Sequence, residues 1–248
     1  MIILDRFYFG EDVNKKYKFN YDRKNNKRPS WVLIYKAPKN LNFIRISIDN
    51  ETFWYRKYFE NYFFPLDATK EDHEIYYDRI AKEYDKLVPQ NKEIANFILK
   101  QLIDFKIQNY APILEIGAGT GLISEKIAKS DYNNLTLLDI SGKALKIAKD
   151  KKVLTHCKFI KSDILQFKSK KKFNVIYSSM ALDYFNEEEL DNIINIIKKH
   201  LIKNGFFICV DRHISKQYGD SFKKIKQGYF FLDTSVGKWR YDYFIGKL

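Results

Sequence analysis

The sequence predicts an α/β protein, because from about residue 110 onward it alternates between two patterns. Short apolar runs are followed by segments in which apolar residues recur three and four positions apart, as in successive βα units. Near the end, two aromatic runs flank a short polar segment, which predicts an antiparallel hairpin. A length of 248 residues suits one domain with an extension before it. We therefore expect a doubly wound, mostly parallel sheet preceded by a smaller region.

The predicted strands of the main domain are short, and helices connect them. They lie at 112–116, 135–140, 158–161, 174–178 and 206–210, with the hairpin strands at 228–232 and 239–244. The longest predicted helix covers 187–202, where Leu190, Ile193 and Ile197 share one face. Acidic residues open this helix and basic residues close it, as the helix dipole favours.

The first part of the chain has a different pattern. Trp31–Tyr35 and Phe43–Ile48 are predicted to form a strand pair, and helices are expected from Thr69 to about Leu87 and from Asn91 to about Phe105. Eight aromatic residues crowd into Phe53–Phe64, where they can wall an apolar cavity, fill a core or form an oligomer interface. The predicted domains are an extension at 1–70, for substrate binding or oligomerisation, and a main domain at 71–248.

Composition excludes several classes of protein. Ten Gly and five Pro rule out a collagen-like chain, and no apolar run reaches the roughly 20 residues of a membrane-spanning helix. Met1–Asp5 meets an acid too early for a signal peptide, and two cysteines cannot form a disulfide framework or a tetrahedral thiolate metal site. We expect a cytoplasmic protein. The net charge of +13 is spread along the chain and permits an anionic partner without requiring one.

The most specific motif is Ile113-Leu-Glu-Ile-Gly-Ala-Gly-Thr-Gly-Leu122. Glu115 lies near the end of a predicted strand, and Gly117, Gly119 and Gly121 follow at alternate positions before a helix. Glycines allow a tight turn and let a ligand lie against bare backbone at a helix N-terminus. In an open α/β sheet, ligands bind at the carboxyl ends of the strands. The motif therefore predicts a cofactor site.

Spacing separates two classes of cofactor. A dinucleotide fingerprint is G-x-G-x-x-G, and this chain has Leu122 where that pattern needs its third glycine. The G-x-G-x-G spacing after an acid resembles the first motif of class I S-adenosylmethionine-dependent methyltransferases. A negative charge on Glu115 would oppose a pyrophosphate and favour a cationic ligand such as a sulfonium.

Acids also end the next two predicted strands. Asp139 lies 22 positions beyond Gly117, where it can accept hydrogen bonds from both ribose hydroxyls, and Ile140 can lie on the adenine face. Asp163 can accept the adenine amino proton. For any one acid, turn or N-cap chemistry is the simpler interpretation. Three acids in register with the glycine loop favour a binding site.

The resemblance covers residues 76–211. It implies a Rossmann-like seven-stranded sheet of order 3-2-1-4-5-7-6 with the last strand antiparallel. The segment Tyr76–Asp85 is similar to the helix over the cofactor in quinone-biosynthesis methyltransferases, which implies that its tyrosines close the pocket; a plain amphipathic helix is the alternative. The expected cofactor is S-adenosylmethionine, with S-adenosylhomocysteine as product. Its expected binding residues are Tyr77, Tyr84, Glu115, Gly117, Ala118, Gly119, Gly121, Asp139, Ile140, Asp163, Ile164 and Ser179.

A general base is needed only when the methylated nucleophile carries a proton. Candidates at the carboxyl edge of the sheet are Asp183, Tyr184 and His213, and no metal is expected. Methyltransferases of exocyclic base amines typically carry an Asn/Asp-Pro-Pro-aromatic motif after the fourth strand. This chain has Ser178-Ser-Met-Ala181 there, which argues against that substrate.

These features predict methyl transfer to a small molecule by direct displacement, mainly through alignment and desolvation. A methyltransferase of RNA or protein is one alternative, and a non-catalytic cofactor-binding or scaffold protein is another. A nucleotide-dependent oxidoreductase is a further class that fits less well. A homodimer is compatible with the sequence.

Overall fold

The computed structural model describes residues 11–12, 19–22, 29, 31–37, 41, 43–48, 51–59, 62–66, 69–234 and 237–248. The described residues do not include Met1–Asp5, on which the signal-peptide argument rests. They also leave out residues 38–40, between the two expected strands. The chain divides into two compact units, Met1–Arg79 and Ile80–Leu248. The sequence places its domain boundary at residues 70–71, so the helix that follows this boundary falls in the first unit.

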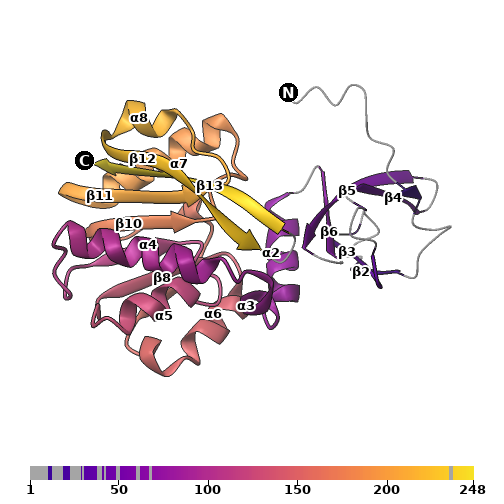
Figure 1. The fold of residues 1–248 in the computed structure, drawn as a ribbon, viewed down its shortest axis with the longest axis horizontal. Helices are drawn as coiled ribbons and strands as arrows, with labels where there is room; N and C mark the ends of the chain where they lie inside the picture. The colour runs from indigo at the N-terminus through magenta and orange to yellow at the C-terminus, as the bar shows by residue number, and fades with distance from the viewer. Residues whose placement is uncertain are drawn as a thin grey trace. The chain divides into compact units, whose positions relative to one another are not determined.

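The second unit is built on a seven-stranded sheet of order β12-β13-β11-β10-β7-β8-β9. Five neighbouring strands of this order, β11, β10, β7, β8 and β9, pair in parallel, and β13 runs antiparallel to both of its neighbours (Figure 1). This arrangement confirms the expected order 3-2-1-4-5-7-6 and the antiparallel last strand. The strands are β7 (Ile113–Ile116), β8 (Leu135–Asp139), β9 (Lys158–Lys161), β10 (Phe173–Ser179), β11 (Leu201–Asp211), β12 (Lys223–Thr234) and β13 (Gly237–Lys247).

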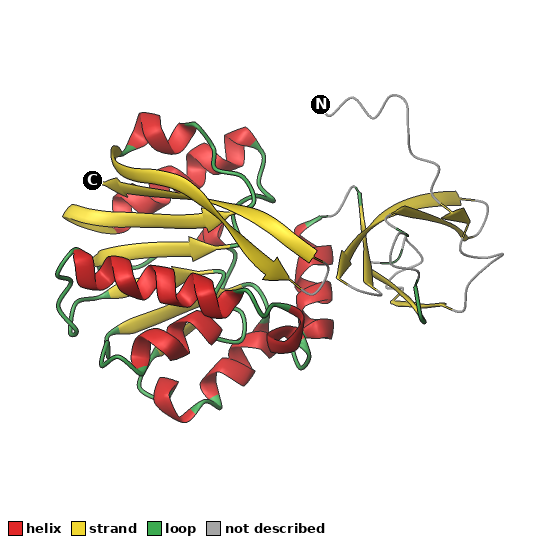
Figure 2. Ribbon diagram, in the orientation of Figure 1, coloured by secondary structure: helices red, strands yellow, loops and turns green. Residues whose placement is uncertain are grey.

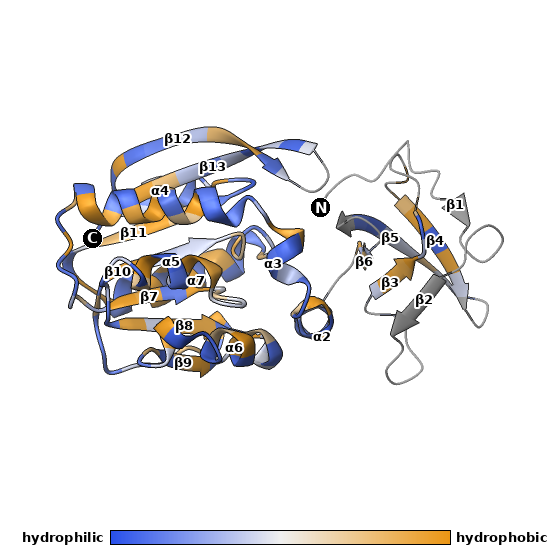
Figure 3. Ribbon diagram, turned by 60° about the horizontal axis from the view of Figure 1, so that its bottom comes forward, coloured by the Kyte–Doolittle hydropathy of each residue, from blue (hydrophilic) through white to orange (hydrophobic). Residues whose placement is uncertain are grey.

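Helices cover both faces of this sheet (Figure 2). On one face, Ile98 and Ile123 pack with Leu137 of β8 in one core; on the other, Ile193 and Tyr218 pack with Ile116 of β7. α4 shows a polar and an apolar side, as its burial requires (Figure 3). The helices are α3 (Tyr84–Leu87), α4 (Asn91–Asp104), α5 (Leu122–Ala128), α6 (Gly142–Lys149), α7 (Glu187–His200) and α8 (Gln217–Ser221), with 3-10 turns η1 (Lys152–Leu154) and η2 (Ile164–Gln166).

Two predicted helices differ in outcome. The helix expected from Thr69 to Leu87 is broken into α2 (Lys70–Ile80) and α3, because the Glu83 N–H bonds back three residues to Ile80 and tightens the chain there. The helix expected from residue 187 is confirmed as α7. The Asn186 side chain accepts the Glu189 N–H at 2.9 Å and forms a capping box that fixes its start.

The first unit contains a six-stranded sheet of order β1-β4-β5-β6-β3-β2. Both strands of the expected pair are present as β3 and β4, but each pairs with other strands: β3 with β2 and β6, β4 with β1 and β5. The aromatic run forms most of β5 and β6, with Tyr55 and Phe63 in the core of this unit. The strands are β1 (Glu11–Asp12), β2 (Phe19–Asp22), β3 (Trp31–Ile34), β4 (Phe43–Ile48), β5 (Glu51–Phe59) and β6 (Tyr62–Pro65).

Two further observations concern the class of protein. Within the described ranges, none of the helices combines the length and the apolar character that crossing a bilayer requires. Cys157 is half-buried and Cys209 is buried, and both thiols are free.

Candidate cofactor and acceptor site

The glycine loop joins β7 to α5 in a tight, anchored conformation that only glycine adopts without strain. Gly117, Gly119 and Gly121 have φ angles of 74°, 53° and 73°, in the left-handed region that residues with a Cβ rarely adopt. The N–H groups of Gly117 and Ala118 both donate to the carbonyl of Leu138, at 2.9 and 3.0 Å. The loop is therefore fixed against the end of β8.

The three glycines differ in the space around them. A Cβ at Gly117 would overlap the side chain of Ala181, and a Cβ at Gly121 would come within 2.8 Å of Leu154. At Gly119 the nearest atom would be a ring carbon of Tyr84, at an ordinary contact distance of 3.7 Å. The outer two glycines thus allow close packing, whereas the backbone of Gly119 faces free space bounded by the Tyr84 ring.

Asp139 connects this loop to the neighbouring strand end. Its Oδ2 accepts the Gly119 N–H at 2.6 Å, and its Oδ1 accepts the Ser141 N–H at 2.7 Å. The backbone carbonyl of Asp139 accepts the N–H of Ser162, which brings the end of β9 alongside. Asp163 follows there, and its Oδ1 accepts the Leu165 N–H at 3.0 Å as the N-cap of η2. Each carboxylate oxygen can accept more than one hydrogen bond, so both acids can still accept hydrogen bonds from a ligand. The expected contacts with ribose and adenine stay predictions.

The other expected cofactor residues fall into two groups. Ala118 and Ile164 are buried, and Ile164 packs in the sheet core. Ile140 is half-buried directly after Asp139. Ser179 ends β10, and its buried hydroxyl has no hydrogen-bond partner among the residues that the structure describes. Ile140 and Ser179 therefore lie at the carboxyl edge of the sheet, and Ile164 serves mainly as core.

Glu115 lies beneath the loop. Its side chain is 2% exposed and accepts a hydrogen bond from the Ser124 hydroxyl of α5, which in turn lies 3.1 Å from the Tyr177 hydroxyl of β10. Burial raises the pKa of Glu115 to about 8. The carboxyl is therefore mostly protonated at neutral pH, so the sequence argument that its negative charge selects a cation loses its basis. A direct cofactor contact of Glu115 stays a prediction.

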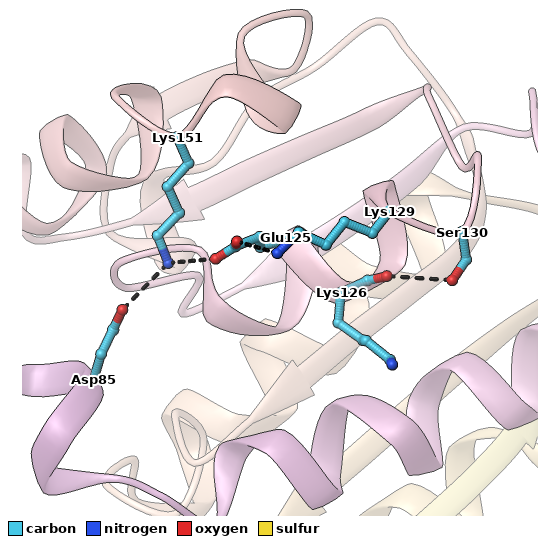
Figure 4. Close-up of polar contacts among 6 residues, drawn as sticks. All are labelled: Asp85, Glu125, Lys126, Lys129, Ser130 and Lys151. Atoms are coloured by element: carbon cyan, nitrogen blue, oxygen red, sulfur yellow. Dashed lines mark hydrogen bonds and ion pairs between the residues drawn. The ribbon is translucent and has the colours of Figure 1, made fainter.

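A polar network that the sequence did not reveal holds α3 against the loop. The Thr120 hydroxyl donates to Asp85, and Lys151 reaches both Asp85 at 3.3 Å and Glu125 at 3.0 Å (Figure 4). This places Tyr84, the preceding residue, beside Gly119. The threonine inside the glycine motif was the available signal, but its partner is 35 positions away.

Tyr77 belongs to the other unit of the chain. Its ring stacks on His73 within Met1–Arg79, at a centroid distance of 6.4 Å. Its expected role at the cofactor pocket stays a prediction.

The catalytic candidates lie after β10 and β11. Arg212 donates from Nε and Nη2 to Asp183 Oδ2, at 2.8 and 2.7 Å, and its guanidinium lies 5.7 Å from the Tyr184 ring centre. Beside them Asp211 is buried, and burial together with the nearby Asp183 raises the pKa of its carboxyl well above the ordinary value. The structure thus brings Asp183 and Tyr184 together around Arg212, whereas His213 is exposed.

The glycine loop, Asp139 and Asp163 all lie within one segment that matches a known protein family. Residues 113–205 match the family described as "Methyltransferase domain". These residues form a methyltransferase domain, and its relatives and structural neighbours support the class I S-adenosylmethionine-dependent type.

Curated relatives of this methyltransferase domain come from several bacteria. Malonyl-[acyl-carrier protein] O-methyltransferase 2 of Ilyobacter polytropus is 36% identical over 122 residues, which are 48% of this chain and 46% of that protein. The Acetivibrio thermocellus malonyl-[acyl-carrier protein] O-methyltransferase is 24% identical over 53% of this chain and 46% of its own length. Demethylmenaquinone methyltransferase of Leptospira interrogans is 25% identical over 69% of this chain and 66% of that protein. The chain spans about half the length of the malonyl relatives.

Solved structures share the fold of the methyltransferase domain. The N-methyltransferase NodS of Bradyrhizobium japonicum, in complex with S-adenosyl-L-homocysteine, has a TM-score of 0.56 and 17% identity; the match covers 70% of this chain and 97% of that one. Magnesium protoporphyrin IX methyltransferase of Synechocystis with bound S-adenosylmethionine has a TM-score of 0.52 and 16% identity, over 73% and 85% of the two chains.

Proposed function

We propose that the methyltransferase domain binds S-adenosylmethionine and transfers its methyl group to a small-molecule acceptor. The observation that supports this most directly is the open backbone of Gly119, which lies between the Asp139 carboxylate and the Tyr84 ring. This combination of bare backbone, acid and aromatic face suits an adenosine with a sulfonium side chain. The cofactor contacts follow as proposals from that fit.

Three residues of the site offer contacts for different parts of the cofactor. Asp139 and Asp163 offer carboxylate lone pairs for ribose hydroxyls and the adenine amino group, and Ile140 offers an apolar surface beside them. When bound, S-adenosylmethionine supplies a methyl group on a positively charged sulfur, which keeps the electron pair of the broken bond. The chain then has to orient the acceptor and exclude water.

Two facts favour a small acceptor. One similar curated protein is named for demethylmenaquinone, a small-molecule acceptor, and the segment Ser178–Ala181 lacks the motif of base-amine methyltransferases.

Calorimetry with S-adenosylhomocysteine tests the cofactor assignment. We expect saturable binding by the wild type and none of NADH at the same concentration. Asp139→Ala should weaken binding by about 1–3 kcal/mol, because the variant loses both its ribose contacts and its hold on the loop. Asp131→Ala, at an exposed loop position, is the matched control and should bind as wild type does. Absence of binding by the wild type would reject the proposal.

A second candidate is methylation of RNA, which the β12–β13 hairpin favours. Tyr229 and Phe231 are 57% and 55% exposed, and the Arg240 guanidinium lies 4.3 Å from the centre of the Tyr229 ring. Exposed aromatic rings beside cations are typical of surfaces that bind single-stranded nucleic acid. Steep loss of tRNA binding with salt would support this candidate, whereas no binding at low salt would exclude it.

A further inference from the structure

The segment after β10 contains a buried carboxylate that uses only one of its two oxygens. The Asp183 side chain is 9% exposed, and Arg212 donates twice to its Oδ2. Its Oδ1 is buried without a hydrogen-bond partner among the residues that the structure describes. A buried acceptor atom with no donor is costly, so a bound molecule that donates a hydrogen bond to this atom would be stabilised there.

The surrounding residues hold this carboxylate in place. The Oδ2 atom of Asp211 accepts the N–H groups of Leu182 and Asp183, at 3.1 and 3.2 Å, and its Oδ1 accepts the Arg212 N–H at 2.9 Å. Asp211 thus fixes the backbone on both sides of the ion pair. The Tyr184 ring lies against the Arg212 guanidinium and limits its movement. The backbone and the side chain of Asp183 are therefore held in a fixed position.

This site is close to the cofactor loop. Ala181, two residues before Asp183, occupies the space that a Cβ at Gly117 would need. The buried hydroxyls of Ser178 and Ser179, at the end of β10, also have no partner within the described part of the chain. All of these residues lie in the unit Ile80–Leu248. The carboxyl end of β10 therefore presents several buried polar atoms beside the glycine loop.

We propose that Asp183 Oδ1 accepts a hydrogen bond from the methyl acceptor, and that the acceptor is a hydroxyl or amine compound and not a carboxylate. This proposal rests on the proposed methyltransferase function. An O–H or N–H group satisfies the buried oxygen, and the same hydrogen bond orients the nucleophile. A carboxylate would place a second negative charge against Asp183, while two N–H groups of Arg212 are already committed to Asp183.

The chemistry of the methylated product tests this assignment. The full chain is incubated with S-adenosylmethionine carrying a labelled methyl group and with a small-molecule extract of bacterial cells. Methyl ethers and methylamines keep the label in mild alkali, whereas methyl esters release it as methanol. We expect alkali-stable label. Label released as methanol would overturn the proposal, and so would absence of labelled product from a protein that binds S-adenosylhomocysteine.

Variants locate the effect at Asp183. Asp183→Asn keeps the size of the side chain but removes its charge. We expect kcat/KM for the methyl acceptor, measured by formation of the labelled product, to fall about 10- to 100-fold. Affinity for S-adenosylhomocysteine should stay within about twofold, which also shows that the variant is folded. The matched control Asp220→Asn, at an exposed position of α8, should keep wild-type turnover.

The two proposals fail in different ways. Loss of S-adenosylhomocysteine binding by the wild type would reject the methyltransferase function itself. Unchanged turnover by Asp183→Asn, with cofactor binding intact, would reject only the acceptor contact. The product chemistry of the wild type still tests whether the acceptor is a carboxylate even where Asp183→Asn fails to fold.

Discussion

The proposed cofactor side and the proposed acceptor side of the methyltransferase domain are built in different ways. At the ends of β7, β8 and β9, the backbone shapes the site. Three glycines have positive φ, and acids accept hydrogen bonds from nearby backbone N–H groups. At the ends of β10 and β11, side chains far apart in sequence meet, as Asp183 and Arg212 do. A site made of backbone suits a constant ligand, whereas a site made of side chains is where the ligand can change.

The largest expected effect concerns Glu115, which lies under the cofactor side. Burial gives Glu115 a pKa of about 8 in the folded chain, against the ordinary value of 4.5, so between these values only the folded state holds the proton. Stability is therefore lost as pH rises through this window. Glu115→Gln should remove that loss and gain about 3–5 kcal/mol over the wild type at pH 8.5, with little difference at pH 5.

Urea unfolding at the two pH values measures this effect. Exposed Glu93→Gln on α4 is the matched control and should follow the wild type at both. Equal pH dependence of wild type and Glu115→Gln would show that Glu115 is charged in the folded state.

The next effect tests the boundary between the two sides. Gly117→Ala forces a Cβ into Ala181 at a positive φ, so we expect a loss of about 2–5 kcal/mol in unfolding free energy. Gly119→Ala has room for its Cβ and suffers only the backbone strain, about 1–2 kcal/mol. Denaturant titrations of both variants measure the difference. Equal losses would mean that the contact with Ala181 contributes nothing.

The smallest effect concerns the network that holds α3. Lys151→Met removes the ion pairs to Asp85 and Glu125, which are partly exposed, and surface pairs contribute about 0.2–1 kcal/mol. We expect S-adenosylhomocysteine affinity to fall about two- to fivefold at low salt, with the gap to wild type closing at high salt. Lys149→Met, an exposed neighbour, serves as control. A gap that persists at high salt would point to lost packing instead of lost charge.

The contrast between the two sides also explains what the sequence could predict. The strands, the hairpin and the glycine loop depend on local periodicity and spacing, so they were predictable from the residues, whereas the sheet order was an implication of the family resemblance. The expected pairing of β3 with β4 assumed that neighbours in sequence pair, but β5 and β6 lie between them in the sheet. The charge state of Glu115 depends on burial beneath α5, which no local pattern reveals.

Long-range contacts account for the remaining omissions. Thr120 and Asp85 meet across 35 positions, and Arg212 reaches Asp183 across 29. Sequence patterns named Asp183 as a candidate without its partner. They also offered His213 as a candidate, with a surface-loop histidine as the alternative, and the structure places it at an exposed position.

The contact between Gly117 and Ala181 has a consequence for redesign. Only one methyl group separates the glycine loop from the segment that leads to Asp183. Any larger side chain at position 181 would push on the loop, so enlarging that residue to reshape acceptor selectivity would also disturb the methyl-donor pocket. Libraries aimed at new acceptors should therefore keep alanine at 181 and vary Tyr184 instead.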